Sequence, residues 1–291
     1  MRELQFFAAS DVGVIRQINQ DSVGAVFPLD SNPESGLFVV CDGMGAHKAG
    51  EVASRLVVDT ILQNYLTFVP ESEAITALKQ SVQLAHEKVL TLASTHKEMS
   101  DMGTTVVAAV TDHNKIYIAN VGDSRAYLLH NNNFQQLTTD HSQVNELVQM
   151  GMLDKREQKN AHRNALSRSI SALRSTVQID MFEERFLEGD QLLLCSDGLW
   201  GQVPDLTIKN VMSRHPVDQA VNRLVKLANK AGGRDNVTVV IVYKGQPMAE
   251  TWKLLPWLFE HPIMLAALVG LLVAVLSLLI IAVWLFGLQS R

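Results

Sequence analysis

The sequence predicts an α+β fold in which antiparallel sheets carry helices on their outer faces. Its apolar segments do not alternate regularly between strand and helix, as a doubly wound parallel sheet would require. Strand segments instead follow one another directly, and helical segments come in pairs between them. One further apolar stretch, residues 263–288, is long enough to add a transmembrane helix.

The predicted strands are short runs rich in β-branched and aromatic residues, bounded by Gly, Asn or Asp. Residues 111–115, Thr-Asp-His-Asn-Lys, lie between two such runs and are typical of a hairpin turn. Strands are expected near residues 4–10, 22–27, 36–41, 104–111, 115–120, 125–130, 178–186, 191–195 and 237–243.

The predicted helices have apolar residues at three- and four-residue spacing, which gives each one apolar face. They are expected at residues 50–67, 72–94, 142–150 and 216–230. Together with the strands they predict one catalytic domain, residues 1–245, followed by a proline-punctuated juxtamembrane linker, residues 246–262.

Residues 263–288 carry no charge and are rich in Leu, Val, Ala and Ile. As a helix they would span roughly 39 Å, more than the roughly 30 Å hydrocarbon core of a bilayer. Trp252 and Trp257 precede the stretch as expected interface anchors. We therefore predict a single-pass C-terminal anchor in the lipid bilayer rather than a buried core helix.

Composition excludes several other classes of protein. The formal net charge is -5 and no Lys/Arg cluster is present, so no nucleic-acid partner is expected. Cys41 and Cys195 lie inside apolar strands, and two cysteines cannot form a disulfide framework. They predict buried, reduced thiols and a catalytic domain on the cytoplasmic side. Neither begins the Cys-x₅-Arg motif of a thiol phosphatase, since His47 and Gly201 occupy the sixth positions.

Four aspartates carry the chemistry that the sequence predicts. Asp42, Asp123 and Asp197 each close an apolar run, and Asp235 precedes one. A carboxylate at a strand end beside Gly lies at the rim of a sheet, where the backbone can approach a ligand. Four such carboxylates would repel one another unless hard cations neutralised them. This pattern predicts a divalent-metal site.

Six short motifs strengthen this interpretation by their order and spacing. The motifs are Arg-x-x-Asn-x-Asp (16–21), Asp-Gly-Met-Gly-x-His (42–47), Gly-Thr-Thr (103–105), Gly-Asp-Ser-Arg (122–125), Ser-Asp-Gly-Leu-Trp (196–200) and Arg-Asp-Asn (234–236). Combined, they resemble the bacterial branch of the PP2C (PPM) family of metal-dependent serine/threonine protein phosphatases, over about residues 6–243. The resemblance implies a β-sandwich of two antiparallel sheets flanked by helices, an α-β-β-α arrangement.

The resemblance also implies the metal ligands. Asp42 would bridge two firmly bound Mn²⁺ or Mg²⁺ ions, with the Gly43 carbonyl on one of them. Asp197 and Asp235 would complete the shell of the first ion, and Asp123 would help Asp197 hold a weaker third ion. Such a pair lowers the pKa of a bridging water and supplies hydroxide for attack on phosphorus.

Other residues acquire supporting roles from the same resemblance. Arg16 would grip the substrate phosphate, since Arg offers a planar fork of donors. His47 would protonate the leaving alkoxide as general acid. Asp21 would hold metal-bound water, while Asn19 and Asn236 would support the site from behind.

Two positions depart from the family pattern. Ala46 stands where the family usually has Gly, and a positive φ there would strain it by about 1 kcal/mol. Gly201 stands where many members have Asp near the third ion, which puts the affinity for that ion in question.

The sequence thus predicts a membrane-anchored phosphoserine/phosphothreonine phosphatase acting on phosphorylated proteins, with a membrane-linked serine/threonine kinase as an expected partner. Two alternatives stay open. One is a catalytically weak pseudophosphatase that binds phosphorylated partners, which loss of Asp42, Asp197 or Asp235 would favour; all three are present. The other is a metal phosphodiesterase that acts on a nucleotide or lipid headgroup.

Overall fold

The computed structural model describes residues 4–29, 31–46, 48–69, 73–152 and 165–245. They belong to one compact unit that ends at Gly245. The predicted linker, 246–262, and the predicted transmembrane helix, 263–288, lie outside the described residues. Within the described ranges, no helix has the length and apolar character needed to cross a membrane.

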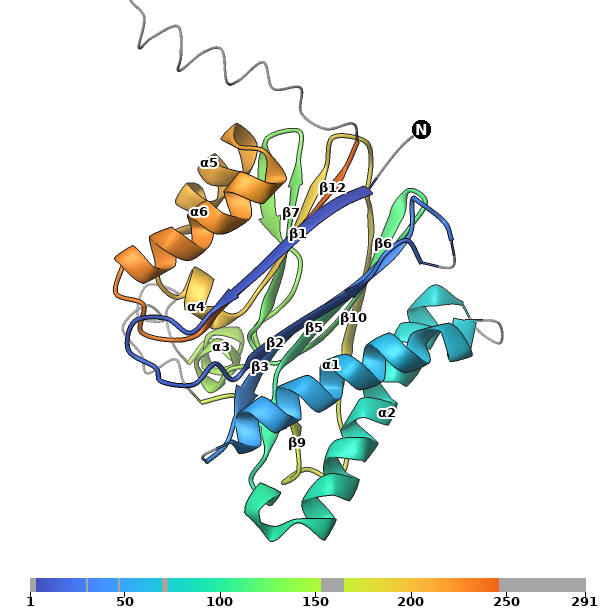
Figure 1. Ribbon diagram of the computed structural model, residues 1–291, viewed down its shortest axis with the longest axis vertical. Coiled ribbons are helices and arrows are strands. Elements are labelled where there is room, and N and C mark those ends of the chain that lie inside the picture. The colour runs from blue at the N-terminus through green and yellow to red at the C-terminus, as the bar shows by residue number, and fades with distance from the viewer. Residues whose placement is uncertain (1–3, 30, 47, 70–72, 153–164, 246–291) are drawn as a thin grey trace, which may run out of the picture. The chain divides into compact units, whose positions relative to one another are not determined.

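Two antiparallel sheets form the centre of this unit (Figure 1). The first has the order β1 (Leu4–Asp11), β12 (Val237–Lys244), β11 (Gln191–Cys195), β7 (Arg125–His130) and β8 (Asn133–Gln136). The second has the order β10 (Asp180–Arg185), β6 (Lys115–Val121), β5 (Val106–Asp112), β3 (Gly36–Met44), β4 (Gly103–Thr104) and β9 (Ile170–Ser171), and β2 (Asp21–Val26) pairs with β3.

Helices cover the outer face of each sheet (Figure 1). On the second sheet, α1 (Ala49–Phe68) packs against β2 and β3, and α2 (Ala74–Thr95) packs against α1. On the first sheet, α6 (Val217–Lys230) packs against β1 and β12, beside α5 (Asp205–Arg214). Three short helices complete the unit: η2 (Lys97–Met99), α3 (Gln143–Gln149) and α4 (Asp197–Trp200).

The central strands are apolar along their whole length because both of their faces are buried. In β3, Phe38 and Val40 point into the core between the two sheets, whereas Leu37 and Val39 pack in the core beneath α1 and α2. Each fully buried side chain of this size contributes about 1.5–3 kcal/mol relative to exposure. The α-β-β-α sandwich therefore has three apolar layers. Among the described residues, the central strands have their polar side chains mainly near their ends.

The predicted sandwich of two antiparallel sheets flanked by helices is confirmed, and every strand and helix expected within 4–245 has a counterpart in the structure. The expected strand 104–111 is interrupted, because Thr105 leaves the ladder and bonds to Asp42. The sequence interpretation missed β8, β9, α4 and α5. The helix α5 begins after Pro204 and contains Thr, Asn and Ser, which are weak helix formers, although Ile208, Val211 and Met212 are buried at helical spacing.

Candidate metal centre

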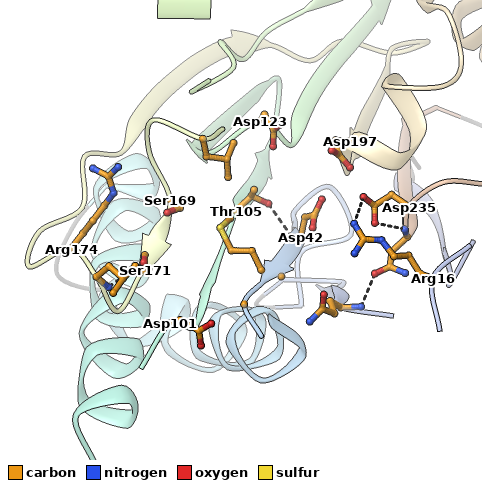
Figure 2. Close-up of a pocket in the computed structure, with 17 residues that line it drawn as sticks. Arg16, Asp42, Asp101, Thr105, Asp123, Ser169, Ser171, Arg174, Asp197 and Asp235 are labelled. Atoms are coloured by element: carbon orange, nitrogen blue, oxygen red, sulfur yellow. Dashed lines mark hydrogen bonds and ion pairs between the residues drawn. The ribbon is translucent and has the colours of Figure 1, made fainter. Parts of the chain in front are cut away.

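The four predicted aspartates meet at one end of the sandwich. Asp42 lies at the end of β3, Asp123 in the turn between β6 and β7, and Asp197 at the start of α4, directly after β11. Asp235 immediately precedes β12. All four line one cavity of about 700 Å³ (Figure 2). Four aspartates that are distant in the sequence therefore line the same cavity.

Backbone contacts hold Asp42 in position. Its N–H donates to Oγ1 of Thr105 at 2.9 Å, and its carbonyl accepts from the Thr104 hydroxyl and the Thr105 N–H, both at 2.9 Å. The next residue, Gly43, passes so close to the carbonyl oxygens of Gly50 and Gln20 that a Cβ would collide with them. Only glycine therefore allows β3 to run this close to the start of α1.

The turn that carries Asp123 is held from two sides. The N–H of Gly122 donates to Nδ1 of His141 at 3.0 Å, and the indole N–H of Trp200 donates to the Asp123 carbonyl at 3.0 Å. The guanidinium of Arg125 lies 3.5 Å from the centre of the Trp200 ring and forms a bidentate pair with Asp140 at 2.6 and 2.8 Å. Asp140 and His141 therefore help to position this turn. Ser142 caps the N-terminus of α3, since its hydroxyl accepts from the N–H of Asn145.

Burial and mutual repulsion destabilise the charged forms of these carboxyls. Burial is the largest cause in each case: it raises the pKa of Asp197 to about 6 and that of Asp123 to about 8. It also raises the pKa of Asp42 well above its usual range, and the charges of Asp21, Asp197, Asp123 and Asp235 add to this effect. The centre is therefore a place where negative charge is costly without a compensating cation.

Arg16 lies beside Asp235 at one end of the cavity, in the loop before β2 (Figure 2). Its Nη2 donates to Oδ2 of Asp235 at 2.8 Å, and this bond is the main cause that raises the pKa of Arg16. The Arg16 side chain is 51% exposed. The guanidinium is therefore at the cavity and accessible, but in this state it is paired with Asp235.

The amide of Asn236 fastens the loop of Arg16 to the start of β12. Its Oδ1 accepts from the Gln20 N–H at 2.8 Å, and its Nδ2 donates to the carbonyls of Val12 and Ile18 at 2.9 and 3.0 Å. Asn19 has a smaller role at this place, since its Oδ1 accepts from the Asp21 N–H and its Nδ2 donates to the Ser10 hydroxyl.

We expect Asn236→Ala to lower the free energy of unfolding by about 1–2 kcal/mol, because it leaves part-buried backbone groups of Val12, Ile18 and Gln20 without this partner. The loop of Arg16 should also loosen, so that the KM for a phosphorylated substrate rises. Urea unfolding and steady-state kinetics measure the two effects. Asn222→Ala is the matched control, since the exposed Asn222 amide bonds only to the carbonyl of Asp218 within α6. Equal effects of the two substitutions would contradict this role.

Comparison with known proteins identifies the family. The family model described as Protein phosphatase 2C matches residues 16–239. The chain belongs to the protein phosphatase 2C family. The serine/threonine phosphatase stp of Listeria welshimeri is 35% identical over 237 residues, which cover 80% of this chain and 93% of that protein. The PP2C resemblance inferred from the motifs is thereby confirmed.

Solved structures of this family superpose on most of the chain. The serine/threonine phosphatase PstP/Ppp of Mycobacterium tuberculosis matches with a TM-score of 0.76 at 31% identity, covering 84% of this chain and all of that one. A second structure, the catalytic domain of PstP in complex with two manganese ions, matches with a TM-score of 0.74 at 31% identity, covering 84% and 100% of the two chains. This PP2C chain is a metal-dependent protein-serine/threonine phosphatase.

The residues present fit divalent cations of this kind. Oδ1 of Asp197 is buried and has no hydrogen-bond partner among the described residues, so it retains a lone pair directed at no donor. All the cavity carboxylates are hard oxygen ligands, which suit Mn²⁺ and Mg²⁺. Within the described ranges, no three His, Cys, Asp or Glu side chains already close around a single point. Asp235 is paired with Arg16 at 2.8 Å.

Asp21 differs from the other aspartates of the PP2C motifs. It pairs with Asp42 in the register of β2 and β3, but it does not line the cavity. Its Oδ2 accepts from the Ser196 hydroxyl at 2.7 Å, its Oδ1 is buried without a partner, and burial raises its pKa to about 7. Asp21 therefore neighbours Asp42 in the sheet without lining the cavity.

The remaining predictions have mixed outcomes. His47, the expected general acid, lies outside the described residues. Ala46 is not among the residues with positive φ, and Gly45 adopts this conformation instead, with φ of 138°. The strain considered for Ala46 is therefore absent. At Gly201, a Cβ would lie 2.7 Å from the Asp197 carbonyl oxygen, so an Asp at this position would require the backbone to shift.

Sequence reasoning missed one whole side of the cavity. Residues 166–174 supply Leu166, Ser169, Ser171, Leu173 and Arg174 to its lining. The segment contains only the two-residue strand β9, so it has no periodic pattern that could have marked it. Its proximity to the aspartates follows from the pairing of β9 with β4, a contact distant in sequence.

Proposed function

We propose that this chain hydrolyses phosphoserine and phosphothreonine in proteins at a centre of two or three divalent cations. The observation that carries the proposal is the convergence of Asp42, Asp123, Asp197 and Asp235 on one cavity that also contains Arg16. Charged carboxylates that are buried this closely are costly, and bound divalent cations make the arrangement favourable at neutral pH. When bound, such ions supply Lewis acidity for the attack of water on phosphorus.

Each residue of the chain then has a separate task. Asp42 would hold both firmly bound ions, the carbonyl of Gly43 would bind one of them, and Asp197 and Asp235 would complete the ligands of the first ion. Asp123 would share a weaker ion with Asp197, and Gly201 leaves that ion without a further carboxylate. His47 would give a proton to the leaving serine or threonine oxygen.

Arg16 would bind the phosphoryl oxygens of the substrate. Its guanidinium cannot keep its bond to Asp235 and also present the same N–H to phosphate, so cation binding at Asp235 would free it. We expect Arg16→Ala to lower kcat/KM for a phosphothreonine peptide about 10- to 100-fold, the effect of losing a charge-assisted hydrogen bond. Arg16→Lys should recover only part of this, since Lys lacks the planar fork. Arg55→Ala, a change at an exposed arginine of α1, should have no effect.

The test of the function is Mn²⁺-dependent release of phosphate from a phosphothreonine peptide by the full chain, with Asp42→Ala as control. We expect rapid release by the unchanged chain and loss in the variant. Equal rates for the two would contradict the catalytic assignment and favour a phospho-binding pseudophosphatase. Cleavage of a phosphodiester without any release from phosphopeptides would favour the phosphodiesterase alternative.

We further propose that residues 263–288 tether the catalytic unit to a membrane and that the unit faces the cytoplasm. The support is the uncharged apolar stretch itself, which is long enough to cross a bilayer. Tethering would raise the local concentration of the phosphatase near membrane-bound partners such as a serine/threonine kinase. In cell fractionation, the full chain should remain in carbonate-washed membranes and a chain ending at residue 245 should not. Release of both chains would contradict the tether.

A further inference from the structure

The cavity continues well beyond the four aspartates. Arg16 and Arg174 lie at its opposite ends, with the carboxylates of Asp42, Asp123 and Asp197 between them (Figure 2). Its volume of about 700 Å³ equals that of more than twenty water molecules at roughly 30 Å³ each. A phosphoryl group has only a few heavy atoms, so most of this space is available to other parts of a substrate.

The wall that carries Arg174 is built into the second sheet. Ser171 of β9 pairs with Gly103 of β4, and β4 pairs in turn with β3 beside Gly43. The N–H of Ala172 donates to the Met102 carbonyl at 3.0 Å. The Ser171 hydroxyl accepts from the Leu173 N–H at 3.1 Å, and the Ser171 carbonyl accepts from the Arg174 N–H at 3.2 Å. Ladder and turn bonds thus connect the backbone of Arg174 to the strand that carries Asp42.

The guanidinium of Arg174 is held in position by a hydrogen bond, but no acidic group among the described residues neutralises its charge. Its Nη2 donates to the carbonyl of Ser167 at 2.6 Å, which orients the guanidinium without cancelling its charge. In the described part of the chain, no carboxylate forms an ion pair with Arg174, whereas Arg16, Arg125 and Arg168 each have an aspartate partner. Arg174 is therefore a cation of the cavity that retains capacity for an anion.

We propose that Arg174 is a specificity residue that receives the carboxylate of an acidic side chain flanking the phosphorylated residue of the substrate. The inference rests on the proposed function, because it takes the phosphoryl group to lie at the aspartates. The neighbouring Leu173 is 77% exposed and offers an apolar contact to the same stretch of substrate. An acidic side chain of the substrate is favoured at the end of the cavity where Arg174 lies, because its charge is opposite to that of the guanidinium.

The test is a series of phosphothreonine peptides in which Glu, Ala or Lys is placed in turn at each position around the phosphorylated residue. We expect the full chain to prefer Glu over Ala at one position by about 3- to 10-fold in kcat/KM, the scale of a solvent-accessible ion pair. Arg174→Ala should abolish this preference, and Arg174→Glu should reverse it in favour of Lys. Arg214→Glu, the same charge change at an exposed residue of α5, is the matched control and should keep the preference for Glu.

Two further measurements separate this proposal from the proposed function. Hydrolysis of p-nitrophenyl phosphate, which has no flanking residues, should change less in the Arg174 variants than hydrolysis of the Glu-containing peptides does. The binding affinities of the same peptides, measured under conditions in which they are not hydrolysed, should show the same preference for Glu over Ala. If no variant hydrolyses phosphate esters, the proposed function fails, while the binding series still decides the role of Arg174. A preference for Glu that persists in Arg174→Glu, no preference at any position, or a preference only for a second phosphoryl group would overturn the proposal.

Discussion

Replacing Asp42 by Asn is expected to lower the kcat for Mn²⁺-dependent hydrolysis of a phosphothreonine peptide at least about 10²-fold, the scale of removing one fixed charge from a preorganised site. The same substitution is expected to make the metal-free chain more stable. Asn keeps the shape of Asp, but it removes a buried charge that four other carboxylates repel. The backbone bonds of Asp42 to Thr104 and Thr105 do not involve its side chain and should persist.

The opposite signs of these two effects make the prediction sharp. A variant that merely unfolds loses activity and stability together, whereas Asp42→Asn should lose the first and gain the second. Steady-state kinetics at saturating Mn²⁺ and thermal unfolding in a chelator measure them. The matched control is Asp59→Asn, since Asp59 is an exposed carboxylate of α1 and should change neither quantity by much. Full activity of Asp42→Asn, or a lower Tm without metal, would contradict the assignment of Asp42 as a metal ligand.

The aspartates could be predicted because their signal is local. Each lies beside Gly or another small residue at the end of an apolar run, and this pattern survives in the linear sequence. No local pattern marks Asn236 as the residue that joins the loop of Arg16 to β12. Its three bonds reach Val12, Ile18 and Gln20, more than two hundred residues away. The positions of Ser171 and Arg174 depend on the two-residue ladder between β4 and β9, which is too short to leave a pattern.

A similar division explains the fold. The strand β3 was predictable because Leu37 to Cys41 is apolar without interruption, as burial on both faces requires. The helix α5 was not, because its weak helix formers are stabilised by packing of Ile208, Val211 and Met212 rather than by intrinsic preference. The break at Thr105 was not predictable either, since the hydroxyl that ends the strand bonds to the distant Asp42.

The second prediction concerns pH and metal together. In the metal-free chain the pKa values of Asp197, Asp21 and Asp123 are about 6, 7 and 8, raised mainly by burial from the ordinary aspartate value of 3.8. Between pH 3.8 and about 8, the folded chain therefore holds protons that the unfolded chain has released. Folding stability falls with pH wherever the folded state binds more protons. The contribution of these groups is thus fully present below pH 3.8 and is lost as pH rises through 6 to 8.

Divalent cations should restore this loss, because they replace the protons and bind only the folded arrangement of carboxylates. At pH 8, Mg²⁺ at about 100 times its Kd should add about 2.7 kcal/mol to the free energy of unfolding, or roughly 5–10 °C in Tm. At pH 5, the same Mg²⁺ concentration should raise the Tm far less, because bound protons compete with the cation. The measured quantity is the difference in Tm with and without Mg²⁺ at the same pH. Groups that do not bind Mg²⁺ titrate equally in both samples, so their contribution drops out of this difference. Asp42→Asn should flatten the dependence, and an increase in Tm that is equal at pH 5 and pH 8 in the unchanged chain would show that Mg²⁺ does not bind at these carboxylates.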